Sequence, residues 1–189
     1  PEDGFFYGIP YPGVYVTDKE GRVAAKFFHG TYKKRDSAEH LIAAATGNVV
    51  LEPDAPSATG GDDDIVLNVS LQGGRGDLRQ GMVREIVVRF ELPEGLHIYG
   101  EPVPEGMVAT KVTIEGAPSL MVEPAVLPPT HTLALHGTDH ELQVWSGTVD
   151  IRVPVYAASE LATEVAPLAH ESTTVDVVVR YKACDDDTC

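Results

Sequence analysis

From residue 65 onward, apolar and polar side chains alternate in short runs, and this period of two constrains the fold more than any other feature. The runs occupy residues 65–71, 83–92, 107–114, 120–127, 142–155 and 175–181, and the fifth is broken near Ser146 and Gly147. Turn segments that contain proline or glycine separate them, at residues 93–95, 104–106, 115–118 and 128–129. A strand with one buried face alternates in this way. About seven short strands with no strong helix between them predict an immunoglobulin-like antiparallel β-sandwich of about 120 residues.

The start of the chain predicts a β-hairpin. Residues 14–17 and 22–28 are strand-like runs joined by Asp-Lys-Glu-Gly. A four-residue turn favours a side-chain acceptor at its first position, which Asp18 supplies, and a residue that tolerates a positive φ at its last position, which is Gly21. We therefore expect the two runs to pair as antiparallel strands.

A short helix is predicted after the hairpin, followed by a linker. Asp36 is placed to accept hydrogen bonds from the first-turn amides, Glu39 reaches back in a capping box, and Gly47 ends the helix. The apolar face of this helix is predicted to hold Leu41, Ile42 and Ala45. Beyond it the apolar pattern gives way to Pro, Ser, Gly and three consecutive aspartates, which predicts an acidic linker. The expected divisions are residues 1–48, the linker 49–63 and the sandwich 64–189.

Composition excludes several classes of function. The 189 residues include 14 basic and 29 acidic side chains, so the formal net charge is −15. Nucleic acid and anionic membrane surfaces are polyanions that such a surface repels, so neither is an expected partner. No apolar run approaches the roughly 20 residues that cross a bilayer. The chain begins with Pro1 rather than Met, so we expect a processed form or a fragment, and the absence of a signal peptide indicates nothing about its location.

A family resemblance can be named for the N-terminal part. Residues 8–23 read Gly-Ile-Pro-Tyr-Pro-Gly-Val-Tyr-Val-Thr-Asp-Lys-Glu-Gly-Arg-Val. With the hairpin and helix, this segment resembles the second half of a thioredoxin-like domain of the peroxiredoxin and redoxin type (alkyl hydroperoxide reductase and thiol-specific antioxidant). The resemblance implies that Pro12 is the family's cis-proline and that Tyr11 before it presents its backbone to an extended substrate. Pro10 is the other candidate, and the alternative is that both prolines only stiffen a loop.

This partial thioredoxin-like ββα unit lacks the family's nucleophilic cysteine, because no cysteine precedes Cys184. The resemblance therefore implies that the reaction centre lies upstream of Pro1 in a longer parent. A hairpin with one helix has too little surface to fold well alone. We expect it to pack against the sandwich or a second copy of the chain, which implies a possible homodimer, through Tyr15, Phe27, Phe28 and Leu41.

Two segments of the remaining chain carry a second family resemblance. Residues 92–100 read Leu-Pro-Glu-Gly-Leu-His-Ile-Tyr-Gly, and residues 177–189 read Val-Val-Val-Arg-Tyr-Lys-Ala-Cys-Asp-Asp-Asp-Thr-Cys. They are similar to a segment that ends in His-Ile-Tyr and to the closing strand and turn of the N-terminal periplasmic domain of the thiol:disulfide interchange protein DsbD, the disulfide bond corrector family. The resemblance implies that Cys184 and Cys189 are the redox pair and that His97 and Tyr99 lie near them and shield them.

The two cysteines also carry a physical argument. Four residues separate them, so a turn could bring their Cα atoms to the roughly 5.5 Å that a disulfide prefers. Closing so short a loop stabilises the fold by only about 2 kcal/mol, which favours a reversible redox pair over a structural bridge. Asp185, Asp186 and Asp187 disfavour thiolates, so the pKa of both thiols should rise and the disulfide should be relatively reducing. A structural disulfide and two free thiols remain the alternatives.

These observations predict an extracytoplasmic, periplasmic thiol:disulfide exchange module that relays electrons through Cys184 and Cys189. It would belong to a larger thiol-disulfide oxidoreductase and exchange with thioredoxin-like or DsbD-like redox proteins. The alternative is a non-catalytic immunoglobulin-like interaction domain with a structural disulfide. No cofactor is expected, and no metal either, because His131, His136 and His140 lack the spacing and the thiolate of a zinc site.

Overall fold

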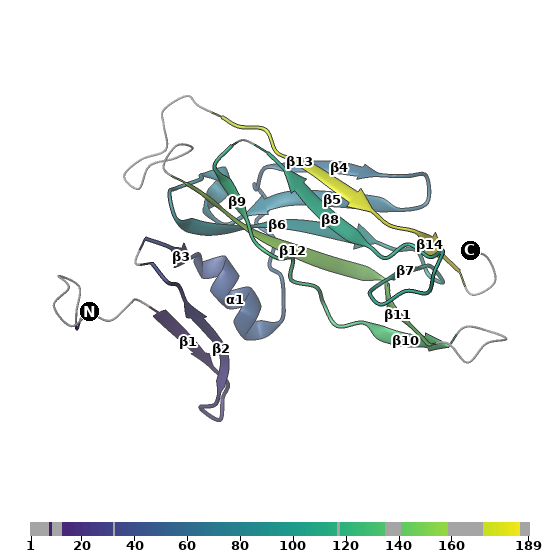
Figure 1. Ribbon diagram of the computed structural model, residues 1–189, viewed down its shortest axis with the longest axis horizontal. Helices are drawn as coiled ribbons and strands as arrows, with labels where there is room; N and C mark the ends of the chain where they lie inside the picture. Colours follow the sequence, from purple (N-terminus) through teal and green to yellow (C-terminus); the bar gives the residue numbers. More distant parts are fainter. Residues whose placement is uncertain are drawn as a thin grey trace.

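The computed structural model describes residues 8, 13–31, 33–116, 118–134, 141–158 and 172–185. These residues form a mostly β structure, an antiparallel sandwich preceded by a ββα unit, which confirms the predicted fold class (Figure 1). In chain order the elements are β1 (Gly13–Thr17), β2 (Val23–Phe28), β3 (Arg35–Asp36), α1 (Ala38–Thr46), β4 (Ser57–Gly61), β5 (Val66–Gln72), the 3₁₀ turn η1 (Gly74–Gly76), β6 (Met82–Glu91), β7 (His97–Tyr99), β8 (Lys111–Glu115), β9 (Leu120–Val122), β10 (His131–Ala134), β11 (Glu141–Ser146), β12 (Thr148–Ala157), β13 (Asp176–Arg180) and β14 (Ala183–Cys184).

The sandwich has two layers around one apolar interior. The first layer is the sheet β4-β5-β6-β12-β9, and the second consists of the sheet β10-β11-β7-β14 and the pair β13-β8. Phe90 from β6 and Ile151 from β12 face Ile98 from β7 and Trp145 from β11, and all four are buried. Figure 1 shows β8 and β13 lying across β5 and β6, where their inward valines complete the interior. The alternation of the sequence is therefore the alternation of a buried and an outward face.

The hairpin and helix form as predicted, but the helix begins one residue later. Asp18 accepts hydrogen bonds from the amides of Glu20 and Arg22, and β1 pairs with β2. Gly47 ends α1 with φ 70°. The predicted N-cap Asp36 was wrong, because Ser37 caps the helix by accepting from the His40 amide at 3.2 Å.

The contacts that hold the ββα unit to the sandwich are also different from those expected. Ala43 is the buried residue of α1, whereas Ile42 and Ala45 are exposed, so the predicted apolar face was wrong. Tyr15 and Phe28 contact each other with ring centroids 5.0 Å apart and are largely exposed. Phe27 and Leu41, the other two residues expected at this contact, are half-buried, and a set of polar contacts joins the unit to the sandwich.

These polar contacts are centred on β6. β3 pairs with the start of β6 in parallel, and the Arg35 amide donates to the carbonyl of Gly81 at 2.8 Å. His40 Nδ1 lies 2.7 Å from Glu85 Oε1, and Arg152 donates to the same oxygen at 3.1 Å. The unit is thus attached through polar groups that are themselves largely buried.

Two boundaries of the sequence prediction change. The range 49–63, expected as a linker, contains β4, which pairs with β5 over its whole length. The strand expected over 107–114 is confined to β8, and that expected over 120–127 is confined to β9 with one bridge at Val126. β7, β10 and β14 were not predicted as separate strands.

Candidate functional site

Cys184 lies on a strand at the edge of a sheet. β14 pairs antiparallel with β7, so that Cys184 is opposite His97 and Ala183 is opposite Ile98. Because side chains alternate along a strand, Ile98 and Ala183 face the sandwich interior while Cys184 and His97 face the other side. Cys184 therefore belongs to the outer face of the second layer.

A second apolar cluster covers this outer face. Cys184 packs with Tyr99, Leu142 and Val144, all buried. The imidazole of His97 lies against the Tyr99 ring, edge to face, and its Nε2 is 3.2 Å from the Tyr99 hydroxyl. Burial raises the pKa of Tyr99, so the phenol stays neutral and can share a proton with His97.

The segment between β7 and β8 closes over the cluster. The Gly100 amide donates to the carbonyl of Gln143 at 2.8 Å, and the Thr110 amide donates to that of Tyr99 at 2.7 Å, so both ends of the segment are fixed. Between them, Val103 and Met107 pack onto the cluster. The position of this cover was not predicted from the sequence. The Val-Pro-Glu-Gly turn of the segment indicates a loop, but it does not show which residues the loop covers.

Cys184 is disulfide-bonded and only 3% exposed. The sequence contains one other cysteine, Cys189, which lies outside the described residues. Asp185, next to the buried cysteine, is exposed. The sulfur of Cys184 is thus enclosed by protein, while the chain just beyond it reaches solvent.

Of the predicted site residues, the structure brings three together: Cys184, His97 and Tyr99. Their roles in exchange stay a prediction. Tyr11, Pro12 and Cys189 lie outside the described residues, as do His136 and His140, while His131 is in β10.

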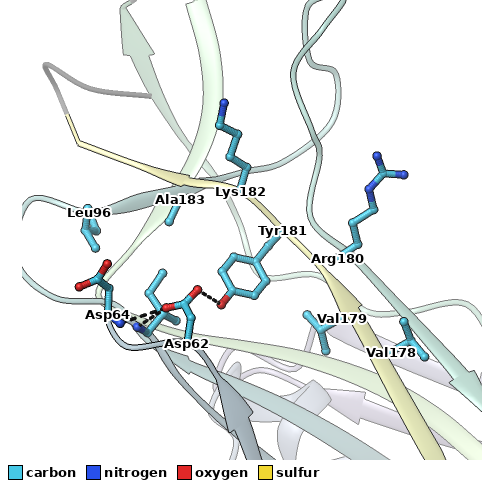
Figure 2. A pocket seen from close by; sticks show the side chains of 10 residues that line it. Asp62, Asp64, Leu96, Val178, Val179, Arg180, Tyr181, Lys182 and Ala183 are labelled. Atoms are coloured by element: carbon cyan, nitrogen blue, oxygen red, sulfur yellow. Dashed lines mark hydrogen bonds between the residues drawn. The ribbon is translucent and has the colours of Figure 1, made fainter.

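A groove on the other side of β14 carries a polar contact that the sequence did not indicate. This groove, of about 720 Å³, is lined by Ala183, Lys182, Leu96 and the 62–65 turn, among others. Figure 2 shows Tyr181 turned toward Asp62, to whose carboxylate its hydroxyl donates at 2.7 Å. Burial, followed by this hydrogen bond, raises the pKa of Tyr181 to about 12, and the bond lowers the pKa of Asp62. Asp62 had been assigned to the linker, so its part in the sandwich could not be foreseen.

The described residues contain neither a candidate metal site nor a candidate membrane span. Within the described ranges, no three His, Cys, Asp or Glu side chains are grouped so that they could hold a metal ion. Among the same residues, no helix has the length and apolar character needed to cross a membrane.

Comparison with known proteins gives a likeness to solved structures but no family. No family model matches the chain, and no curated protein matches it. Among solved structures, the chain is similar to the N-terminal periplasmic domain of ScsB from Proteus mirabilis, with 13% sequence identity and a TM-score of 0.46. The match covers 70% of this chain and 45% of that chain, so the present chain spans less than half of it. A likeness this weak carries no argument about function.

Proposed function

We propose that the chain is a thiol:disulfide exchange module in which Cys184 and Cys189 form the reactive disulfide. The observation that carries the proposal is the position of Cys184: disulfide-bonded, on a short edge strand, on the outer face of its sheet. A disulfide that serves only to staple a sandwich would join its two layers through the interior. Here Cys184 faces away from the interior, beneath the Val103 and Met107 cover.

Because Cys184 is buried, we expect the partner to attack the sulfur of Cys189. A thiolate of a reduced dithiol partner attacks the sulfur of Cys189, the S–S bond breaks, and Cys184 leaves as the thiol or thiolate. The partner's second thiolate then attacks the mixed disulfide, which releases Cys189, so the partner is oxidised and this pair is reduced. The reverse sequence passes the two electrons to an oxidised protein. His97 and Tyr99 are the polar groups beside Cys184 that can share the proton it gains.

We place this reaction in an extracytoplasmic compartment, because disulfides persist in oxidising environments. The partners are redox proteins of the thioredoxin-like class, which present a reactive cysteine at an accessible helix end. The acidic surface and Asp185 favour partners with a neutral or basic rim around that cysteine.

A redox titration of the folded chain tests the proposal. We expect the pair to equilibrate reversibly in dithiol buffers, with a potential between roughly −120 and −270 mV, the range of soluble thiol carriers. Circular dichroism at each potential should show the sandwich folded throughout. A pair that is reduced only below roughly −300 mV, or only when the domain unfolds, would contradict the proposal.

A trapping experiment tests the assignment of the two sulfurs. With Cys184→Ala, the remaining Cys189 should attack a thioredoxin that keeps only its nucleophilic cysteine and carries it as a 2-nitro-5-thiobenzoate disulfide. The thiobenzoate leaves, and the mixed disulfide accumulates because neither protein retains a second cysteine to resolve it. The matched control is Cys189→Ala, in which the remaining Cys184 is buried and should form far less adduct. Equal yields from the two variants would show that burial of Cys184 does not direct the attack.

One observation favours a second function, that of an interaction domain with a structural disulfide. Cys184 is as buried as the apolar residues around it, such as Leu142 and Val144, and buried cysteines are commonly inert. The same titration separates the two functions, because a structural disulfide resists reduction until the fold is lost.

A further inference from the structure

The sandwich leaves one side of β13 open. β13 pairs with β8, and in the part of the chain that the structure describes it has no second strand neighbour. β4, at the edge of the facing layer, likewise pairs with β5 and with no other described strand. Each of these edges presents backbone donors and acceptors that another extended chain can use.

A continuous groove runs between the two open edges. It consists of three adjoining hollows of about 720, 440 and 290 Å³. The first and second share Val179 and Tyr181, and the second and third share Val175 and Val177. Its apolar lining comes from the inward valines of β13 and from β5, so the groove is an uncovered part of the sandwich interior.

The dimensions of the groove fit one strand. All five residues of β4 are exposed. They are Ser, Ala, Thr and two Gly, whose small side chains leave room above the sheet. A strand of five residues is about 17 Å long, the length of β13 itself. A second copy of the sandwich would bring its own facing sheet into the same space, whereas a single extended segment brings only one strand.

The charged side chains on the exposed face of β13 determine which charges an added strand should carry. Asp176, Val178 and Arg180 alternate on the outward face, with the acid at one end and the base at the other. Figure 2 shows the Arg180 side chain pointing away from Asp62, whereas Tyr181 points towards it; Arg180 lines the outer part of the first hollow. In an antiparallel pair, side chains directly opposite each other interact, so an acid suits the position opposite Arg180 and a base the position opposite Asp176.

We propose that this groove binds an extended peptide segment of a partner protein, which adds to β13 as an antiparallel strand. Read from its N-terminus, the segment has an acidic residue, an apolar residue, a β-branched residue, a second apolar residue and a basic residue. Its first and last side chains pair with Arg180 and Asp176, and its two apolar side chains enter the groove against Val177 and Val179. The inference does not depend on the exchange reaction proposed for Cys184.

Two peptides of identical composition test the register. The probe is acetyl-Thr-Glu-Val-Thr-Val-Lys-Tyr-amide, and the control has its Glu and Lys interchanged. In a nitrogen-15 NMR titration of the full chain, the probe should shift the amides of β13 and β4 and bind about fivefold or more tightly than the control, since both charge pairs become repulsive in the control. Equal affinities, or shifts confined to other strands, would overturn the proposal.

Two variants sharpen the test. The double variant Asp176→Lys/Arg180→Glu should reverse the preference, binding the control peptide more tightly than the probe. Gly60→Phe fills the groove, because a Cβ at Gly60 meets no other atom within 4 Å, and it should abolish binding of both peptides. Gly30→Phe is the matched control, since Gly30 is equally open but does not line the groove, and it should bind the probe as the natural chain does. Binding that survives Gly60→Phe would overturn the proposal.

Hydrogen exchange in the free chain gives a separate test. We expect the β13 amides that face the groove to exchange faster than those that pair with β8, and to become protected when the probe binds. If they are already protected in the free chain at low concentration, the chain itself covers the edge. If their protection grows with concentration alongside a dimer in sedimentation, a second copy covers it. Either result overturns the proposal.

Discussion

The central strands β6 and β12 have two faces that differ in chemistry. On one face, Val88, Phe90 and Ile151 join the two layers of the sandwich through an apolar interior. On the other, Glu85 lies between His40 of α1 and Arg152 of β12, and this face holds the ββα unit. The same pair of strands thus makes one junction by burying apolar area and another largely by pairing charges.

Because of this difference, the stability of the two junctions should respond differently to salt and to substitution. Apolar burial contributes roughly in proportion to area and, unlike a charge pair, is not screened by salt. A buried charged network is different, because its net contribution is small while it is complete and the loss is large when one member is removed. We therefore expect the sandwich to remain folded under conditions that release the ββα unit.

The largest effect is expected in the apolar junction. Phe90→Ala removes a fully buried ring that packs edge to face on Tyr181, with centroids 5.5 Å apart. The lost transfer free energy and the cavity left behind should reduce the free energy of unfolding by about 3–5 kcal/mol. Urea unfolding followed by tryptophan fluorescence measures this, since Trp145 lies in the same cluster. A loss below about 1 kcal/mol would show that this interior is not the main source of stability.

A smaller and more local effect is expected in the charged junction. Glu85→Gln keeps the shape but removes the negative charge that Arg152 and His40 contact, and we expect a loss of about 2 kcal/mol, because both partners retain some solvent contact. Native-state hydrogen exchange should show α1 losing protection while β7 and β11 keep theirs. Equal loss of protection in both regions would mean that the two junctions are one cooperative unit.

The alternation of apolar and polar residues explains which strands could be predicted from the sequence. The runs that became β5, β6, β11, β12 and β13 have a strong period of two, and each bears a buried face. β4 was missed because Ser, Ala, Thr and Gly carry no apolar signal, and its pairing depends on β5. β7 was missed as a strand because three residues are too few to show a period.

The site was partly predictable for a similar reason. The family-like segments indicated His97, Tyr99 and Cys184, which the register of β7 and β14 brings together.

At the start of α1, local sequence could not choose between Asp36 and Ser37 as the N-cap, since both residue types suit it. The choice is made by distant contacts: the Asp36 carboxylate is held by His29 at 2.8 Å, which leaves Ser37 to cap the helix.

The Tyr181–Asp62 hydrogen bond tests whether a polar contact matters at the edge of the apolar junction. Tyr181→Phe should reduce stability by about 1 kcal/mol at neutral pH. The folded-state pKa of Tyr181 is raised from 10.0 to about 12, so the folded state holds its proton more tightly. That contribution is complete below pH 10 and is lost as the pH rises towards 12. Urea midpoints between pH 8 and 11, roughly spaced by half a unit, should fall less steeply for Tyr181→Phe; parallel curves would contradict this.

The smallest effect is expected for the ion pair between Arg89 and Asp150, which lies on the same face as Glu85 but nearer to solvent. Both nitrogen contacts are short, at 2.7 and 2.8 Å, and the hydrogen bond raises the pKa of Arg89. The side chains are nevertheless 25% and 18% exposed, against 2% for Glu85, so Asp150→Asn should cost only about 0.5 kcal/mol, and less in 1 M salt. Because Glu85→Gln and Asp150→Asn remove the same charge from one face of the same sheet, the ratio of their effects isolates burial from charge. A ratio near one would mean that the charged junction holds the ββα unit no better than a surface ion pair would, and that the buried Val87 and Ala43 hold it instead.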